Sequence, residues 1–325
     1  MNLPRRRFLH LAAGIPAVLA APHVARAQNY PARPLRFLVG FPAGGGADTV
    51  VRIIVPWLSD KLGQQIIVEN RPGASTGLAI QAAVNSPPDG HTLVHFGASS
   101  VVNSIMHSNL PFDLQRDIAL VAGLVEYPMV LVVNPSFSAK SVADLIAEAK
   151  ANPGKLTMAS FGTGSASHLA GELFKLMAGV NMVHVPYRGG APMIADLVGG
   201  QVQIGFDVMT TSLPQIRAGK LRALAVLGTN QFELLPGVPT VGETVPGYEA
   251  RTWAGVAVPR RTPPEIIARL NRHINEGLAD PTIKARLAEA GTVPLVLSAA
   301  KFSSYFASEF EKWAKVVKFA GIKTE

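Results

Sequence analysis

The sequence predicts an α/β fold with two lobes, each built on a mostly parallel sheet flanked by helices, with a ligand cleft between the lobes. From Pro34 onward, short apolar runs typical of buried strands alternate with longer stretches of helical periodicity. This alternation occurs in two series, and apolar strand patterns at 129–135 and 253–259 mark the two passages between them. A chain of 325 residues that is 48% apolar and 16% charged is also large enough for two cores.

The first series begins with a strand expected at 35–41 and a helix at 47–63, inside which Pro56 predicts a kink or a break. It continues with a strand at 65–70, a helix at 75–85 and a strand at 91–96. Because open α/β sheets bind ligands beyond the carboxyl ends of their strands, we expect the binding site in the cleft.

The second series begins with the strand at 129–135 and a helix at 141–154, where Ser141 and Asp144 have the spacing of a capping box. Its further strands are expected at 156–160, 182–187, 202–207 and 221–228, and its helices at 165–178 and 190–198. After a loop rich in Pro and Gly at 236–247, the strand at 253–259 leads into helices at 263–279, 281–290 and 299–317. We therefore expect residues 28–128 and 254–325 to form lobe one and residues 129–253 to form lobe two.

The first 27 residues have the pattern of an export signal. Arg5, Arg6 and Arg7 precede a short, weakly apolar stretch at 11–22, and "ARA" fits a small-x-small site with cleavage after Ala27. "RRRFLH" resembles a twin-arginine signal, and the general secretion route remains the alternative. The apolar stretch is too short and too interrupted by proline for a membrane anchor, so we expect a periplasmic mature chain that does not insert into the membrane.

Charge and composition exclude several classes of function. The leader holds four of the 30 Lys and Arg residues and no acid, which leaves 26 basic against 22 acidic residues and lowers the net charge from +8 to +4. This charge is too small for a nucleic-acid binding protein. The absence of cysteine excludes disulfides and thiolate metal sites, and the eight histidines are scattered without ligand spacing. We expect no metal and no cofactor.

Two loops of unusual composition follow strands and end at helix N-termini. "GFPAGGGAD" lies at 40–48 and "SFGTGSASHLAGE" at 160–172. Glycines leave the backbone N–H groups uncovered, and a helix N-terminus favours an anion. Two such loops facing each other would hold a carboxylate without Arg or Lys. The alternative for Gly44, Gly45 and Gly46 is a difficult turn between strand and helix.

Enzyme motifs fit these loops poorly. Gly46 is followed by Ala47 and Asp48 and not by the lysine of a P-loop. "GTGSAS" ends on Ser167, where both a dinucleotide fingerprint and a nucleophile elbow require glycine. Ser165 and His168 have i,i+3 spacing and could touch on one helix face, so an exported esterase-like hydrolase that uses both residues is the alternative function. The structural interpretation of Ser165 is that it caps the helix.

Other polar residues stand at predicted strand ends. Asp48 complements the helix dipole or contacts a ligand, and Asp207 ends a strand at the expected cleft. Tyr187 and Arg188 precede a glycine pair and a new helix, so they are candidates for the wall of the pocket and for a second carboxylate. Ser99 follows another strand end and is a further candidate for ligand contact.

Several stretches together resemble the Bug family of extracytoplasmic solute receptors, the substrate-binding components of tripartite tricarboxylate transporters. They include "GFPAGGGAD", "VENRPGASTGLAIQAA", "PPDGHTL", "GTGSASHLAGELF", "VPYRGGAPMIADLVGGQVQIGFD" and "AGKLRALAV", in order along essentially the whole mature chain. The resemblance departs at Val39, Gly40 and Phe41, where many relatives have Val-Pro-Phe.

The resemblance implies a two-lobed periplasmic binding protein, type II-like and not an enzyme. Such a monomer would close by hinges near 127–135 and 250–259 around a small mono- or dicarboxylate and deliver it to two membrane permease subunits. A receptor for a membrane signalling partner is the alternative. By position, the ligand-contact candidates are Phe41, Ala43, Gly44, Gly45 and Gly46 in one loop, Ser160, Gly164, Ser165 and His168 in the other, with Tyr187, Arg188 and Asp207 nearby.

Overall fold

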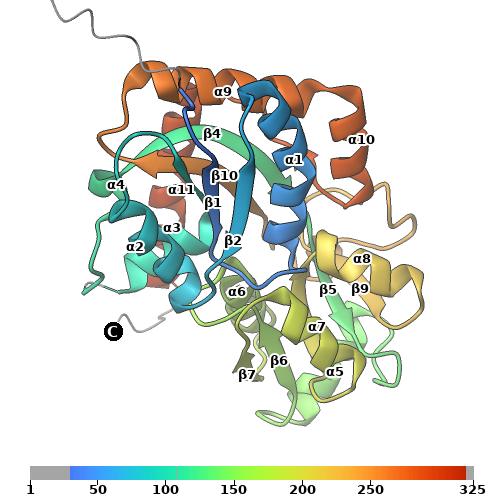
Figure 1. Ribbon diagram of the computed structural model, residues 1–325. Coiled ribbons are helices and arrows are strands. Elements are labelled where there is room, and N and C mark those ends of the chain that lie inside the picture. The colour runs from blue at the N-terminus through green and yellow to red at the C-terminus, as the bar shows by residue number, and fades with distance from the viewer. Residues whose placement is uncertain (1–29, 108, 320–325) are drawn as a thin grey trace, which may run out of the picture.

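Two mixed β-sheets form the framework of the protein, whose computed structural model describes residues 30–107 and 109–319 (Figure 1). The six-stranded sheet has the order β11-β4-β10-β3-β1-β2. Its strands are β1 (Leu35–Val39), β2 (Ile66–Asn70), β3 (Thr92–Gly97), β4 (Ile118–Tyr127), β10 (Thr252–Pro259) and β11 (Val293–Pro294). β2, β1 and β3 pair in parallel, with Phe37 opposite both Val68 and Leu93, whereas β10 runs antiparallel to β3 and β4.

The five-stranded sheet belongs to the second lobe and has the order β7-β6-β8-β5-β9. Its strands are β5 (Met129–Val133), β6 (Thr157–Ser160), β7 (Val183–Pro186), β8 (Ile204–Val208) and β9 (Arg222–Val226). β7, β6 and β8 pair in parallel, and β5 lies antiparallel between β8 and β9. The helix-joined strands within each of the runs β1–β2–β3 and β6–β7–β8 are therefore parallel, as the sequence predicts, whereas β5, which the next helix joins to β6, runs antiparallel to it.

Apart from the two-residue β11, which pairs antiparallel with β4, the strands that run against their neighbours are β5 and β10, which enter each sheet from the other lobe. The chain passes from β4 to β5 across the single residue Pro128, and it returns to the first sheet through β10. Both β5 and β10 are inserted between strands of the sheet they enter. This insertion makes both sheets mixed.

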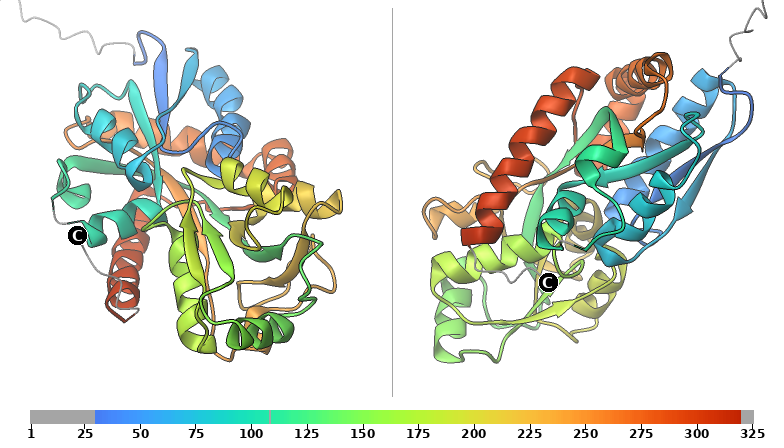
Figure 2. Two further views of the ribbon diagram at one scale, coloured as in Figure 1. Left: turned by 90° about the horizontal axis from the view of Figure 1, so that it is seen from below. Right: turned by 90° about the vertical axis from the view of Figure 1, so that its left-hand side faces the viewer.

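Helices cover both sheets (Figure 2). Those around the first sheet are α1 (Gly46–Leu62), α2 (Gly77–Val84), α3 (Ala98–Met106), α4 (Leu114–Asp117), α9 (Pro264–Ala279), α10 (Pro281–Glu289) and α11 (Ala299–Phe319). Those around the second are α5 (Val142–Ala151), α6 (Ala166–Ala178), α7 (Gly190–Val198) and α8 (Met209–Arg217). The chain also forms two short 3-10 helices, η1 (Ala74–Thr76) and η2 (Val241–Glu243). No helix in the described ranges is long and apolar enough to cross a bilayer.

Several elements differ from the sequence-based expectation. The strand β4 and the helices α3 and α8 were not expected, and α1 continues through Pro56 without a break. The helix expected at 75–85 begins only at Gly77 because η1 precedes it. Ser141 caps α5 by accepting the Asp144 N–H at 3.1 Å, but the Asp144 carboxylate bonds Lys140 N and not Ser141 N, so the capping box is incomplete. The predicted leader lies outside the described residues.

The C-terminal helix α11 closes one face of the first lobe. It contacts α3 and β4, and its Phe302 is fully buried. The Phe302 ring packs edge-on against Phe96 of β3 and Trp253 of β10, with centroid distances of 5.8 and 5.7 Å. This aromatic cluster joins the end of the chain to the central strands.

We predict that Phe302→Ala lowers the free energy of unfolding by about 3–5 kcal/mol, because it leaves a cavity between α11, β3 and β10. The exposed neighbour Lys301 provides the control, and Lys301→Ala should stay within about 0.5 kcal/mol of the parent. Urea unfolding followed by circular dichroism measures both. Equal stabilities of the two variants would contradict the packing described for α11.

Candidate functional site

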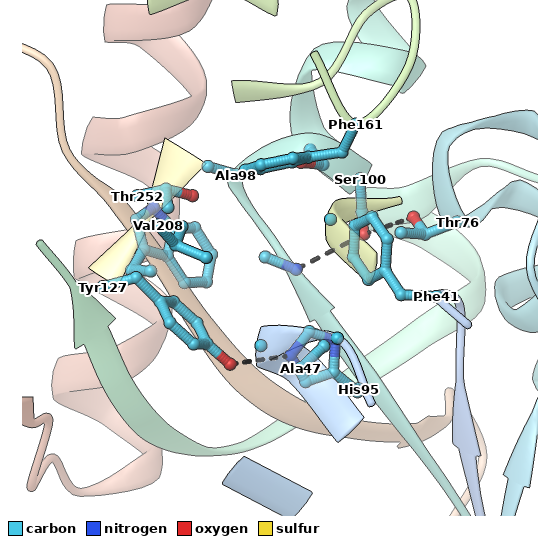
Figure 3. Close-up of a pocket in the computed structure, with 16 residues that line it drawn as sticks. Phe41, Ala47, Thr76, His95, Ala98, Ser100, Tyr127, Phe161, Val208 and Thr252 are labelled. Atoms are coloured by element: carbon cyan, nitrogen blue, oxygen red, sulfur yellow. Dashed lines mark hydrogen bonds between the residues drawn. The ribbon is translucent and has the colours of Figure 1, made fainter. Parts of the chain in front are cut away.

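A cavity lies where the two lobes meet, at the carboxyl ends of β1, β3 and β8 (Figure 3). The first lobe contributes glycines and small residues at the starts of α1 and α3, together with aromatic and polar side chains. The second lobe contributes Phe161, Gly190 and Val208. The lining residues from the first lobe and its crossing strands are Phe41, Gly45, Gly46, Ala47, Thr76, His95, Gly97, Ala98, Ser99, Ser100, Tyr127, Thr252 and Trp253.

The N-terminus of α1 supplies unpaired backbone donors to this cavity. Within the loop, the N–H of Gly44 donates to Asp48 Oδ2 at 2.9 Å and that of Gly45 to the Pro42 carbonyl at 3.3 Å. The N-cap residue is Gly45, which has no side chain to cap the helix. Within the described residues, no acceptor bonds the N–H of Gly46 or Ala47, and both residues line the cavity. A 17-residue helix thus presents free N–H groups and its positive dipole end here.

Asp48 stabilises the loop that leads into α1. Its carboxylate is buried, accepts from Arg52 Nε at 2.9 Å and from Asn70 Nδ2 at 3.0 Å, and also receives the Gly44 N–H. Burial on its own would raise the pKa of Asp48, but the hydrogen bonds from Arg52, Gly44 and Asn70 bring this pKa below its ordinary value. The side chain therefore satisfies protein donors and fixes the path of the three glycines.

The amides of the second loop are mostly taken up by the protein itself. Ser165 is the N-cap of α6 and accepts the His168 N–H at 3.1 Å. The remaining bonds run from Gly162 N to Ser160 Oγ, from Gly164 N to His168 Nδ1, from Ser165 N to Gly162 O and from Ala166 N to Ser99 Oγ, at 3.1–3.3 Å. This differs from the expectation that amides of both loops face an acid. The last of these bonds joins the two lobes.

Two stacked histidines support the second loop. The rings of His168 and His184 lie 4.0 Å apart with an interplanar angle of 21°. His184 Nε2 is 2.7 Å from Ser160 Oγ. Burial lowers the pKa of both imidazoles to about 4, so both are neutral at pH 7. The imidazole Nδ1 of His168 accepts the Gly164 N–H, so the ring of His168 is not hydrogen-bonded to the Ser165 hydroxyl, which bonds only the backbone N–H of His168.

Direct contacts hold the lobes together on both sides of the cavity. The rings of Phe41 and Phe161 meet edge-on with centroids 6.4 Å apart. On the α1 side, a Cβ atom on Gly46 would lie only 2.3 Å from Thr210 Oγ1 of α8. The absence of a side chain at Gly46 therefore permits the close approach of α1 to the second lobe.

Thr76, His95 and Tyr127, which the sequence did not single out as ligand contacts, line the rest of the cavity together with Ser100, which follows the same strand end as Ser99. Thr76 Oγ1 and Ser100 Oγ are 2.7 Å apart, and Tyr127 Oη lies 3.5 Å from His95 Nε2 (Figure 3). Burial lowers the pKa of His95 to about 4, so this ring is neutral at pH 7. No Lys, Arg, Asp or Glu is among the described residues that line the cavity. Thr76 and His95 lie in a loop and a strand whose spacing carried no functional signal.

The remaining predicted site residues divide between the cavity and its surroundings. Phe41, Gly45, Gly46 and Ser99 line the cavity, whereas Ala43 and Gly44 are exposed. The Tyr187 hydroxyl donates to Asp196 at 2.7 Å, and Arg188 lines an outer groove. Ser160, Gly164, Ser165 and His168 are buried in the second loop.

Asp207 lies behind the cavity wall and is fully buried. Its Oδ2 accepts the hydroxyls of Thr211 and Ser212, each at 2.6 Å, while Oδ1 is 3.7 Å from where a Cβ of Gly190 would be. Burial raises the pKa of Asp207 to about 6 against the opposing effect of these hydrogen bonds. The side chain orders the start of α8, while its Oδ1 has no hydrogen-bond partner among the described residues.

The two-sheet architecture and the interlobe cavity define a two-lobed binding protein. Among solved structures, Rpa4515 of R. palustris with adipate superposes with a TM-score of 0.88 at 35% identity and covers 90% of this chain and 99% of its own. MatC of Rhodopseudomonas palustris with bound malate superposes with a TM-score of 0.84 at 29% identity, covering 89% and 100%.

The sequence comparison identifies the family. Residues 50–322 match the tripartite tricarboxylate transporter family receptor, and the chain belongs to this family. It is 37% identical over 310 residues to the protein BugT of Bordetella pertussis, covering 94% of each chain. The family resemblance inferred from the motifs is thereby confirmed.

We predict that Gly46→Ala separates the lobes, because the new methyl group would collide with Thr210 Oγ1 and lie 3.1 Å from Val208 Cγ2. Small-angle X-ray scattering should show a larger radius of gyration than for the parent. Adding Thr210→Ala should restore most of the parent's compactness. Gly228→Ala is the control, since a Cβ there has open space. An unchanged scattering profile for Gly46→Ala would contradict the contact between α1 and α8.

We also predict that acid destabilises the protein through its buried histidines. The folded-state pKa of His184 lies near 4, below the ordinary 6.5, so its contribution to stability is complete above about pH 6.5 and is lost as the pH falls toward 4. The contribution of Asp207 to stability changes with pH in the opposite direction. Because the pKa of Asp207 is raised in the folded state, protonation of this carboxyl favours folding as the pH falls below about 6, and this gain partly offsets the loss from His184.

His184→Gln should therefore give a shallower loss of stability between about pH 6.5 and about pH 4, by on the order of 1 kcal/mol after allowing for partial exposure. Urea unfolding across this range measures the slope. Ser160→Ala is the matched control, because it removes the hydrogen bond to His184 and keeps the titrating ring. The same slope in His184→Gln as in the parent would show that protonation of His184 does not oppose folding.

Proposed function

We propose that this protein is a periplasmic solute receptor that holds the carboxylate of a small organic acid in the interlobe cavity and delivers the acid to the permease subunits of a tripartite tricarboxylate transporter. The observation that carries the proposal is that, in the part of the chain the structure describes, the N–H groups of Gly46 and Ala47 have no acceptor and no charged side chain lines the cavity. An anion at a helix N-terminus is stabilised by the N–H groups and by the helix dipole.

Hydroxyl groups complete the proposed carboxylate site. Ser99 and Ser100 line the cavity at the start of α3, and Thr76 lies beside Ser100. Each well-formed hydrogen bond to a charged group contributes roughly 1.5–3 kcal/mol, so two amides and one or two hydroxyls suffice for micromolar affinity. The bound adipate and malate of Rpa4515 and MatC support an organic acid as the ligand class.

The two-lobed arrangement supports a mechanism of hinge closure in a monomer. We assign residues 28–128 with 254–325 to one moving lobe and residues 129–253 to the other. The connections at Pro128 and before β10 are the two hinges. An acid that contacts both lobes favours the closed form by its higher affinity for that form, and the permease would recognise the closed surface. Export and cleavage after Ala27 place the receptor in the periplasm.

The hydrolase alternative finds little support in the local geometry. A serine nucleophile needs a base within hydrogen-bond reach of its hydroxyl. Ser165 Oγ accepts the backbone N–H of His168, and His168 Nδ1 accepts the N–H of Gly164. Both groups are thus engaged in capping α6, and we assign no catalytic function to them. A sensory receptor uses the same site and differs only in its membrane partner.

We predict that organic acids raise the melting temperature of the protein after bound ligand has been removed by unfolding and refolding. A ligand at 100 times its Kd stabilises the folded state by about 2.7 kcal/mol. A screen of mono-, di- and tricarboxylates should therefore contain clear hits, and the amides of the same acids, which lack the charge, should not shift the melting temperature. If no acid produced a shift, the receptor assignment would fail.

Ser165→Ala separates the receptor from the hydrolase. We expect the variant to lose about 1 kcal/mol of stability through the missing N-cap and to retain acid binding in the same screen. A hydrolase would instead show ester turnover in the parent and lose it in the variant. Ester hydrolysis assays with the parent and Ser165→Ala check this directly, and turnover that depends on Ser165 would refute the receptor proposal.

A further inference from the structure

The carboxyl group of Asp207 is buried directly behind the wall of the interlobe cavity. Its residue has no exposed surface. The next residue along β8, Val208, and Gly190 at the start of α7 both line the cavity. Asp207 Oδ1 lies 3.7 Å from the position of a Cβ atom on Gly190. The part of the wall that these two residues form is therefore all that separates the carboxyl group from a ligand in the cavity.

The two oxygens of Asp207 have different surroundings. Oδ2 accepts the hydroxyls of Thr211 and Ser212, each at 2.6 Å. Oδ1 is buried and has no hydrogen-bond partner among the described residues. A buried charge without a donor is unfavourable, and protonation removes the charge. Oδ1 is thus the oxygen that would carry a proton, since Oδ2 is already occupied by two donors.

No charged side chain of the described residues compensates the charge of Asp207. Burial raises its pKa to about 6, against hydrogen bonds from Ser212, Thr211 and the Val208 backbone. The neighbouring strands β5 and β6 carry no titratable side chain. On the adjoining helices the titratable side chains are either bonded to other groups or exposed: His168, Glu172 and Lys175 of α6, Asp48, Arg52, Asp60 and Lys61 of α1, Asp196 of α7 and Arg217 of α8. From the cavity side, the titratable groups are the neutral imidazole of His95 and the phenol of Tyr127.

We propose that the receptor binds its acid together with one proton from solvent, which Asp207 takes up at Oδ1. The inference rests on the proposed function, because it requires a ligand carboxylate at the start of α1. Asp207 and this carboxylate would be two negative charges separated by a wall that holds no charged side chain in the described ranges. Like charges at close range favour the protonated form of one of them. The N–H groups of α1 stabilise the ionised ligand, so the proton goes to Asp207.

The affinity for an acid then depends on pH with a defined sign. A bound anion raises the pKa of Asp207 further above about 6. The affinity is therefore highest below about pH 6 and falls as the pH rises toward the pKa of Asp207 in the complex. We expect a dissociation constant about tenfold larger at pH 8 than at pH 6, and an uptake of about half a proton per bound acid at pH 7.

Isothermal titration in phosphate and in Tris, two buffers of different ionisation enthalpy, measures the proton uptake. The probes are adipate, malate and each acid that raises the melting temperature in the screen. All are ionised at pH 7, because ordinary carboxyl pKa values lie near 4. Asp207→Asn supplies a neutral side chain of the same shape. It should abolish the uptake and bind these acids about tenfold more tightly than the parent at pH 8, a gain that a purely structural role of Asp207 does not predict.

Two further variants separate Asp207 from other sources of the effect. Asp196→Asn is the matched control, because it removes the same charge from α7 of the same lobe at a carboxylate that bonds Tyr187 and lies outside the cavity wall. It should keep the proton uptake and the pH dependence of the parent. His95→Gln removes the imidazole that lines the cavity, whose pKa a bound anion would also raise. The uptake at pH 7 should survive in this variant.

The outcomes distinguish this inference from the receptor function. Binding to the parent without proton uptake, or uptake that survives Asp207→Asn, would overturn the inference and leave the receptor function intact. Uptake that disappears in His95→Gln would assign the proton to the imidazole and would also overturn it. If Asp207→Asn does not fold, the uptake by the parent and its survival in His95→Gln decide the question. Failure of every acid to bind the parent would overturn both proposals.

Discussion

The arrangement of the molecule depends on the two points where the chain crosses between the sheets. β5 follows β4 after one residue, and β10 returns to the centre of the first sheet. Each lobe therefore contains a strand that comes directly from the other lobe. Because these strands are internal to their sheets, the lobes cannot separate far without breaking ladder hydrogen bonds. The carboxyl ends of β1, β3 and β8 consequently stay opposite one another, and the cavity forms between them.

The chemistry of the cavity depends on whether the residue at the start of each helix has a side chain that caps the helix. Gly45 cannot cap α1 with a side chain, so the N–H groups of Gly46 and Ala47 stay unpaired, whereas Ser165 caps α6 and uses its donors internally. The two loops look alike in composition, but one presents donors to the cavity and the other presents a rigid, internally bonded surface. An anion would accordingly be held mainly by the first lobe and covered by the second.

The sequence contained enough information to predict the alternation of strands and helices and the family. The parallel strands follow from apolar runs and glycine punctuation, and the loop at 40–48 is recognisable because three glycines precede a helix. β4 was missed although its sequence "IALVAGLVEY" is apolar, because no turn residue separates it from the short helix before it. Thr76, His95 and Tyr127 could not be found, since only the tertiary structure brings a strained loop, β3 and the end of β4 together. One use of the second loop's amides was equally hidden, because the N–H of Ala166 bonds Ser99 of the other lobe.

The unpaired donors also explain why such a site would couple binding to closure. A buried N–H without an acceptor costs roughly 1–3 kcal/mol, so an empty closed cavity is penalised unless water enters it. In an open form the N–H groups of Gly46 and Ala47 would be hydrated, and this penalty would vanish. Only in the closed form do the oxygens of a bound carboxylate accept from these N–H groups while the second lobe covers the ligand. Ligand binding thus removes a cost that belongs to the closed form alone, and this difference in free energy is what shifts the population toward closure.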